Sequence, residues 1–495
     1  MKHKLLLSIL LLALLLRLNG IFTEPLYMDE AFSIRVADSP SEAFYGSFSS
    51  EEHPPFFNVL LSFWKMLAGN TIWGLRLLSV LAGVGAVLFG YLTVKQLLPE
   101  KVAFLTAFML AIAAEHVKMS QQVRPYMLIT FLMFASLYYF LRAMKTNEKR
   151  HWTGYIIFTV LSGYTVHFSV LLMVTLLGLA LYMRSDFKSF KGFLIAEAIT
   201  VLLLIPNLFI AWHQLNYLTF MQQFGPAVHP LWQWLILPYN IFAFLFGTNN
   251  PFLKDFTINM AWLPLLLISL AAFAFFFIRG LTMRKKPLVF FLATVILPFI
   301  LIWLPSFFTY MQIEPKRFLF ISLGLYAMIA YGILSLKRLR WTAISLAAIL
   351  LIIPLISFYQ FSYIDWPALT RSIEAHEQPG DVIGVSLNGI TLVLDHYYHG
   401  PSPVVGIPQE YLTEEQLTSF KRNTHIGHII QEGNFEHLFT TSFQGKGRLW
   451  LVSSRAEAGD PQGVLSDYLT DHYTLIDHQS FSEGRAELFL YDLRN

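Results

Sequence analysis

The sequence of 495 residues contains no cysteine at all, and only 14% of its residues are charged. The absence of cysteine excludes disulfides, thiolate catalysis, iron–sulfur clusters and cysteine-based zinc sites. The low charge, together with 55% hydrophobic residues and 45 phenylalanines, lies far outside the range of a soluble enzyme. The chain is therefore predicted to be a polytopic α-helical membrane protein.

Other signals are missing as well. The C-terminal tail contains no glycine-rich phosphate loop, so nucleotide binding there is not expected. The net charge of +3 is small and the basic residues form short clusters between apolar runs, which excludes a nucleic-acid-binding surface. Internal repeats and low-complexity tracts are absent too, which excludes a solenoid.

Apolar runs long enough to cross a membrane recur along residues 1–360. A span needs about 20 apolar residues, and that length predicts about eleven transmembrane helices. They lie near residues 4–22, 72–97, 102–115, 126–143, 152–166, 168–183, 192–212, 258–278, 287–308, 317–336 and 341–359. The first has Lys2 and Lys4 before it and no small-residue cleavage site after it, so we expect a retained helix and not a signal peptide.

Lysine and arginine residues mark every second loop, which predicts that these loops and the N-terminus face the cytoplasm. The basic loop residues are Lys95, Lys101, Arg142, Lys145, Lys149, Arg150, Arg184, Lys188, Lys191, Arg279, Arg284, Lys285, Lys286, Lys337, Arg338 and Arg340. The first large loop is mostly acidic and is expected outside. Two interrupted, aromatic-rich runs, 54–68 and 231–247, are predicted to lie in the outer interface, which preserves the alternation.

The tail from about residue 361 is polar and rich in turns. A helical pattern begins at Trp366 and ends at Pro379-Gly380. Strands are expected at 381–385, 403–406, 448–452 and 487–491. The chain is thus predicted to consist of a transmembrane domain, residues 1–360, whose first outer loop is 23–71, and an extracytoplasmic α/β domain, residues 361–495.

An acidic pair, Asp29-Glu30, follows the first apolar segment, and its loop continues to Glu51-Glu52-His53-Pro54-Pro55. A carboxylate pair just outside a bilayer is placed to act on something that the membrane carries, which suggests a lipid-linked substrate. The pair could also stabilise the first turn of a helix expected to begin at Ala31, by about 0.3–1 kcal/mol.

Further motifs follow in a characteristic order. Ser120-Gln121-Gln122-Val123-Arg124-Pro125-Tyr126 enters one helix, and Arg317-Phe318-Leu319 opens a late one. The tail contains Ile364-Asp365-Trp366, Pro379-Gly380-Asp381 and His396-Tyr397-Tyr398. With the acidic pair and His53-Pro54-Pro55, this order resembles the GT-C glycosyltransferases. It is most similar to the bacterial branch that groups with protein O-mannosyltransferases and lipid A aminoarabinose transferases.

The resemblance implies an inverting glycosyltransferase in the bacterial cytoplasmic membrane. Its donor would be a sugar on polyprenyl phosphate, and its acceptor a hydroxyl outside the membrane, on a lipid, a glycan or a protein. Asp29 is the candidate base that takes the acceptor proton, and Glu30 could orient Asp29 or the acceptor. No cofactor or metal is expected, although a divalent cation beside the pair could neutralise the donor phosphate.

Arginines are the candidate ligands of that phosphate, because a guanidinium can meet two phosphate oxygens at once. Arg124 and Arg317 are the first choices, and His53, Glu52 and Arg17 are expected to border the same cavity. An ordinary role stays open for each, since helix-end arginines commonly snorkel at the bilayer boundary.

Two other classes of protein compete with this interpretation. A lipid or sugar transporter, such as a flippase, would also expose carboxylates and arginines to a membrane cavity, but with paired halves and polar residues near mid-membrane. Here the informative polar residues gather on the predicted outer side, which favours an enzyme. A non-catalytic scaffold with an outer binding domain is the third interpretation.

Overall fold

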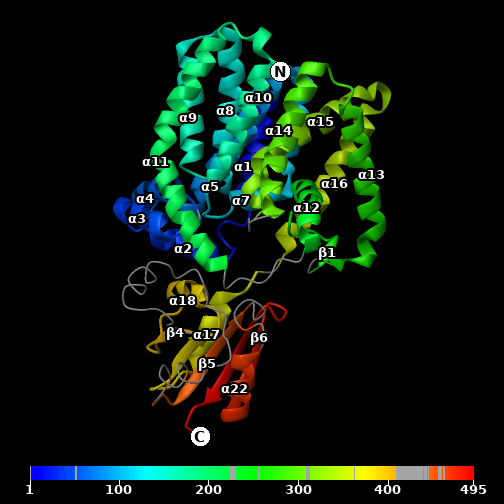
Figure 1. The fold of residues 1–495 in the computed structure, drawn as a ribbon. Coiled ribbons are helices and arrows are strands. Elements are labelled where there is room, and N and C mark those ends of the chain that lie inside the picture. The colour runs from blue at the N-terminus through cyan, green and yellow to red at the C-terminus, as the bar shows by residue number, and fades with distance from the viewer. Residues whose placement is uncertain are drawn as a thin grey trace. The chain divides into compact units, whose positions relative to one another are not determined.

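The computed structural model describes residues 2–50, 53–222, 230–254, 257–307, 313–361, 363–407, 439, 443, 445–454, 460 and 463–494. The chain divides into two compact units (Figure 1). The membrane unit comprises Met1–Phe22, His53–Trp212 and Pro226–Phe361. The second unit comprises Thr23–Glu52, His213–Gly225 and Ser362–Asn495, so the acidic loop belongs to the same unit as the tail.

The membrane unit is a bundle of helices with one short hairpin. Its helices are α1 (Lys2–Leu18), α4 (Phe56–Ala68), α5 (Ile72–Leu97), α6 (Glu100–Ile112), α7 (Ala114–Ser120), α8 (Tyr126–Thr146), α9 (Lys149–Gly163), α10 (Val170–Tyr182), α11 (Phe190–Gln222), α12 (Pro230–Phe246), α13 (Leu263–Gly280), α14 (Lys285–Trp303), α15 (Ser322–Ser335) and α16 (Arg340–Gln360). Single 3-10 turns are η1 (His167–Ser169), η2 (Arg184–Asp186), η3 (Met260–Trp262), η4 (Pro305–Phe307), η5 (Pro315–Ile321) and η6 (Lys337–Leu339), and the hairpin pairs β1 (Leu253–Lys254) with β2 (Thr257–Ile258).

Among the described residues, seven helical segments are long and apolar enough to cross a membrane. They are Ile72–Leu97, Tyr126–Thr146, Phe190–Gln214, Met260–Gly280, Lys285–Trp303, Pro315–Ser335 and Lys337–Gln360. The pair α6 and α7, bent by 59°, is an eighth candidate. The predicted spans 4–22, 152–166 and 168–183 form shorter helices. A multi-pass membrane protein is confirmed, and the count of eleven stays a prediction.

The bundle is built around α1, which packs on α5 and α6. From this centre α8 and α9 extend to one flank, and α15, α13 and α14 extend to the other (Figure 1). The backbones of α13 and α15 lie so close that a Cβ on Gly280 would clash with the carbonyl of Met328. Small residues at helix crossings permit such an approach. Inside a bilayer the hydrophobic effect does not drive helices together, so close packing of this kind holds them.

Polar contacts join the basic loops of the membrane unit to one another, at the end of the bundle where the N-terminus lies (Figure 1). The links are Lys2 to Glu100, Lys145 to the carbonyl of Gln96, the Lys188 amide to the carbonyl of Met144, Lys286 to Asp186 and Arg279 to Ser335. Loops that were assigned to one side from their charge alone therefore share one end of the structure.

The second unit contains a five-stranded mixed sheet with the order β4-β3-β5-β7-β6. Its strands are β3 (Val382–Val385), β4 (Val404–Gly406), β5 (Arg448–Ser454), β6 (Thr474–Phe481) and β7 (Ala486–Asp492). Its helices are α2 (Met28–Val36), α3 (Pro40–Ser50), α17 (Trp366–His376), α18 (Thr391–Tyr397) and α22 (Val464–His472), with a 3-10 turn η7 (Asn388–Ile390). Strand β3 runs parallel to β4 and β5, and β7 runs antiparallel to β5 and β6.

The predicted α/β character of the tail is confirmed, because the four expected strands form β3, β4, β5 and β7 and the expected helix forms α17. A buried ion pair fixes the start of the neighbouring strands β3 and β5. Asp381, immediately before β3, accepts hydrogen bonds from Arg448 Nε (2.9 Å) and Nη2 (2.7 Å) and from Trp450 Nε1 (2.9 Å). Its carboxylate is almost fully buried, so these partners replace lost water.

Candidate donor-binding site and acidic loop

Basic side chains surround the ring of Tyr126 in the membrane unit. The Arg124 guanidinium lies 5.7 Å from the ring centroid, and the Lys316 ammonium lies 5.5 Å from it. The ring of His53 meets the same ring edge-on, with 5.7 Å between centroids. Both charges are close enough for a cation–π interaction, so one aromatic ring holds residues from three distant parts of the chain together.

Arg317 belongs to the same cluster. The pKa of His53, which lies outside the membrane-spanning helices, is held well below its ordinary value by burial and then by the charges of Arg317 and Arg124. Arg124, Arg317 and His53 are all more than 90% buried. The structure therefore brings together three of the predicted site residues, with His53 uncharged at neutral pH.

Three cations, Arg124, Lys316 and Arg317, gather in this cluster. Glu314 faces two of them, with its Oε2 3.1 Å from Lys316 Nζ and 3.5 Å from Arg317 Nε. Guanidinium and ammonium groups supply the charge-assisted hydrogen bonds that an anion such as a phosphate accepts.

Proline residues set the backbone that presents these cations. Pro125 occupies the residue before α8 with φ of −67°, so Arg124 and Tyr126 flank the start of that helix. Pro315 opens the 3-10 turn η5 in the same way, immediately before Lys316 and Arg317. Proline fixes φ near the helical value and lacks the N–H that a helix start would leave unpaired. Both prolines therefore restrict the backbone next to the cationic residues.

The acidic pair lies on the first turn of α2, in the second unit. The helix begins at Met28 and not at Ala31, because Glu30 caps it: the Glu30 Oε2 accepts a hydrogen bond from the backbone N–H of Tyr27 at 3.1 Å. Glu30 is buried, whereas Asp29 is partly exposed. The capping interpretation thus applies to Glu30, and Asp29 is the carboxylate of the pair that solvent or a ligand can reach.

The Arg17 side chain is held by hydrogen bonds to the backbone and to one hydroxyl. Its guanidinium donates to the carbonyls of Leu110 (3.2 Å) and Ala111 (3.0 Å) and to the Ser120 hydroxyl (3.0 Å), and it also donates to the carbonyl of Ala13. The carbonyls at the end of α6 lack helical partners where the chain bends into α7, so Arg17 satisfies them. These contacts favour a structural role, and substrate binding by Arg17 stays a prediction.

Gln121 performs the reciprocal task at the end of α1. Its Nε2 donates to the carbonyls of Leu16 (3.2 Å), Arg17 (3.3 Å) and Asn19 (2.5 Å). Each of the two helix ends is therefore capped by a side chain that belongs to the other segment. The side chains of Ser120 and Arg17 leave no room for a side chain at Gly83. A Cβ there would clash with the Ser120 hydroxyl and lie 2.7 Å from Arg17 Nε.

A second buried polar network lies on α7. Glu115 accepts hydrogen bonds from the backbone and hydroxyl of Thr248 (2.8 and 2.9 Å), and Lys118 donates to the same hydroxyl (2.7 Å) and to Asn249 (2.8 Å). The sequence analysis missed these residues, and it missed Tyr126 and Lys316 as members of the cluster. Lys316 had one usable signal, since it directly precedes Arg317.

Two further predictions concern metal and Glu52. No group of three or more histidine, aspartate or glutamate side chains with metal-binding geometry occurs in the described part of the chain. Glu52 lies outside the described residues.

Comparison with known proteins agrees with this geometry. Residues 52–210 match the family model for dolichyl-phosphate-mannose-protein mannosyltransferases. That stretch contains His53 and Arg124. No curated protein sequence matches the chain.

Several solved structures share the fold. The apo oligosaccharyltransferase of Archaeoglobus fulgidus is 14% identical, over 92% of this chain and 70% of that one, with a TM-score of 0.56. ArnT from Cupriavidus metallidurans in the apo state is 12% identical, over 98% of this chain and 97% of that one, with a TM-score of 0.52. The archaeal oligosaccharyltransferase AglB from Archaeoglobus fulgidus, in complex with an inhibitory peptide and a dolichol-phosphate, is 13% identical over 98% and 74%, with a TM-score of 0.54.

These comparisons confirm the resemblance seen in the sequence. The chain has the fold of the GT-C membrane glycosyltransferases.

Proposed function

We propose that the chain is an inverting glycosyltransferase that moves a monosaccharide from a polyprenyl-phosphate donor to an acceptor hydroxyl. The observation that carries the proposal is the cationic cluster in which Arg124 and Lys316 lie over Tyr126 and Arg317 lies near His53. The family match and the GT-C fold support it, and AglB, which shares the fold, was solved with a dolichol-phosphate.

The cluster's task is to hold the donor phosphate. Negative charge grows on that phosphate as the bond to the sugar C1 breaks, and cations already in place stabilise it without reorganising. Arg124 and Arg317 supply planar pairs of donors for the phosphate oxygens, and Lys316 adds a point charge. Neutral His53 adds a hydrogen-bonding group to the site without adding a charge.

Asp29 is the proposed base. Its carboxylate takes the proton of the acceptor hydroxyl while the hydroxyl oxygen bonds to C1 from the face opposite the phosphate, which inverts the configuration. Glu30 holds the first turn of α2 through its bond to Tyr27 and thereby positions Asp29. The polyprenyl phosphate leaves with the electron pair of the broken bond.

We further propose that the reaction needs no metal or organic cofactor, because the cationic side chains can neutralise the leaving phosphate. A related Archaeoglobus fulgidus oligosaccharyltransferase was solved with Zn and sulfate, so the question is experimental. Turnover should persist in EDTA. A loss of turnover that a divalent cation restores would contradict this part of the proposal.

The proposed location is the bacterial cytoplasmic membrane, with the N-terminus inside and both the acidic loop and the domain of residues 361–495 outside. The clustering of the basic loops at one end of the bundle supports that orientation. Because the chain has no cysteine, single cysteines report sidedness cleanly. Ser41→Cys should react with an impermeant maleimide in intact cells, and Thr282→Cys should react only after lysis. The opposite pattern would reverse the topology.

The decisive experiment follows the donor. Purified full-length protein should release polyprenyl phosphate from a polyprenyl-phosphate sugar when hydroxyl acceptors are offered, and Arg124→Ala should reduce that release. Arg338→Ala, which removes a charge from the basic loops, serves as the matched control. A flippase or a scaffold would leave the glycosyl–phosphate bond intact.

A further inference from the structure

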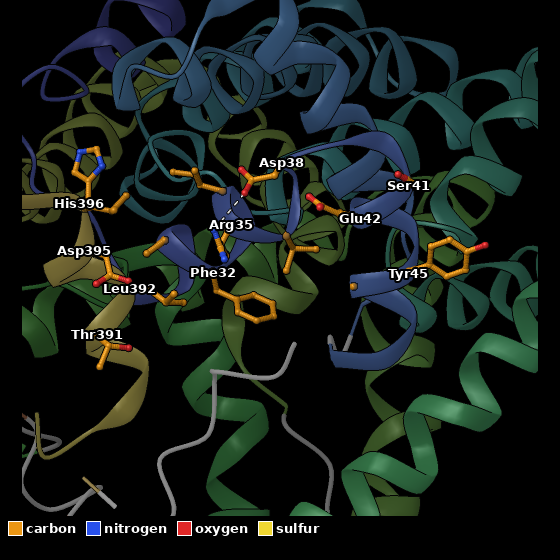
Figure 2. A pocket seen from close by; sticks show the side chains of 15 residues that line it. Phe32, Arg35, Asp38, Ser41, Glu42, Tyr45, Thr391, Leu392, Asp395 and His396 are labelled. Carbon is orange, nitrogen blue, oxygen red and sulfur yellow. Dashed lines mark ion pairs between the residues drawn. The ribbon is translucent and has the colours of Figure 1, made fainter. Parts of the chain in front are cut away.

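A cavity of about 930 Å³ lies within the second unit, between the acidic loop and the tail domain. Helices α2 and α3 form one wall, and α18 forms the other (Figure 2). The two walls belong together, because α2 packs on α18 and the backbone N–H of Leu26 donates to the Tyr397 hydroxyl at 2.8 Å. The cavity is therefore built from two segments far apart in the sequence.

The walls are predominantly polar. Arg35 and Asp38 form an ion pair (3.5 Å) at the α2 side, and Glu42 points into the same space from α3 (Figure 2). Asp395 faces them from α18, and burial raises its pKa, an effect that the charge of Arg35 partly opposes. Charged side chains of both walls therefore face the same cavity.

An aromatic side chain completes the accessible lining. Phe32 on α2 lies along the cavity but is only 1% exposed, whereas Tyr45, which is 64% exposed, stands at the α3 edge (Figure 2). An exposed aromatic ring combined with carboxylates and a guanidinium suits a ligand that has apolar faces and many hydroxyls. The carboxylates accept hydrogen bonds from such hydroxyls, and the ring contacts a C–H face.

The charge of the lining selects among ligands. Among the lining residues that the structure describes, Asp38, Glu42 and Asp395 place three carboxylates beside the guanidinium of Arg35. His396 adds no positive charge near neutral pH, because burial and then His399 lower its pKa. A phosphorylated or carboxylated ligand would meet net repulsion in this cavity, whereas a neutral sugar chain would not.

The cavity also has a defined relation to the proposed base, since both lie on α2. Phe32 follows Asp29 by three residues, which corresponds to about 4.5 Å along the helix axis, and Arg35 follows it by about 9 Å. These spacings match a sugar ring or two. We infer that this cavity binds a neutral oligosaccharide, the end of which is the acceptor in the proposed transfer. Only the statement that the bound oligosaccharide is the acceptor rests on the proposed function, because binding itself can be measured without donor.

Binding is tested first, on the full-length protein in detergent and without donor. The probes are neutral linear oligosaccharides of mannose, glucose, galactose and arabinose, each with a singly phosphorylated counterpart. At least one neutral probe should bind, and Glu42→Gln with Asp395→Asn should weaken it at least about tenfold, because two hydrogen-bond acceptors lose their charge. Asp471→Asn, which removes an exposed carboxylate from α22, should bind as the wild type does.

Transfer is tested second. With the bound oligosaccharide as acceptor, the cavity variant should raise the acceptor KM more than it lowers kcat. Binding without any release of polyprenyl phosphate would refute the proposed function and keep the site. Failure of all neutral probes to bind, tighter binding of the phosphorylated ones, or equal binding by the cavity variant would each overturn the inference.

Discussion

Replacing Gly83 by alanine tests the interlocked helix ends of the membrane unit. The added methyl group would clash with the Ser120 hydroxyl and lie 2.7 Å from Arg17 Nε. Arg17 cannot move freely, because it is fully buried and holds carbonyls at the break between α6 and α7. The extra carbon therefore has to displace the Ser120 hydroxyl together with the guanidinium bonded to it, or the backbone.

The size of the effect follows from two opposing terms. Overpacking of a well-packed interior costs about 1–3 kcal/mol. An alanine in a helix gains up to about 1 kcal/mol over glycine. Gly178→Ala on α10 isolates the second term, because a Cβ there would meet no heavy atom of the described residues within 4 Å. The two variants should differ by about 1–3 kcal/mol, with Gly83→Ala the less stable.

The assay is heating of the detergent-solubilised protein, followed by size-exclusion chromatography with tryptophan fluorescence. For a chain of this size the difference corresponds to an apparent Tm lower by about 1–3 °C for Gly83→Ala than for Gly178→Ala. Equal transition temperatures would refute the close packing of Gly83, Ser120 and Arg17, and with it the argument that Arg17 serves the helix break.

Three other predictions concern the site and the tail. Asp29→Asn should lower turnover about 10²–10⁴-fold while donor binding is kept, and near-normal turnover on a verified substrate would exclude Asp29 as the base. Arg317→Ala should weaken binding of polyprenyl phosphate, with partial recovery in Arg317→Lys, and unchanged affinity in both would remove Arg317 from the phosphate site. Burial tends to raise the pKa of Asp381, but hydrogen bonds from Arg448, the Gln378 amide and Trp450 outweigh it and lower that pKa below 3.8. The pair therefore stabilises the tail at neutral pH and loses its contribution as the pH falls through the lowered pKa. Asp381→Asn should cost about 3 kcal/mol at pH 7 and flatten the acid dependence, measured by pulse proteolysis of the tail in the full chain.

The membrane helices and most of the sheet could be predicted because their signal is local. Long apolar runs predict helices in a bilayer, and short apolar runs such as 448–452 predict buried strands. Strand β6 was missed because its residues, Thr474–Phe481, are mostly exposed and polar, and the side chains that bond it to β7, such as those of His478 and Ser480 with Glu487, are polar too. An edge strand of this kind carries almost no hydrophobic pattern.

The site divides in the same way. Arg124 and Arg317 could be selected from their motifs, but their meeting beside His53 depends on how α8 and η5 pack, which no local pattern encodes. The predicted start of α2, Ala31, lies three residues after the observed start, Met28. The Glu30 side chain caps the N–H of Tyr27 and thereby extends the helix, and this contact leaves no mark in the apolar pattern. The catalytic role of Asp29 stays a prediction.

The reciprocal caps of Arg17 and Gln121 have a consequence for biogenesis. Arg17 lies in the last turn of the first helix, and its carbonyl partners on Leu110 and Ala111 are synthesised long after it. The first helix therefore reaches its final polar contacts only after the segment that ends in Ala111 has been made.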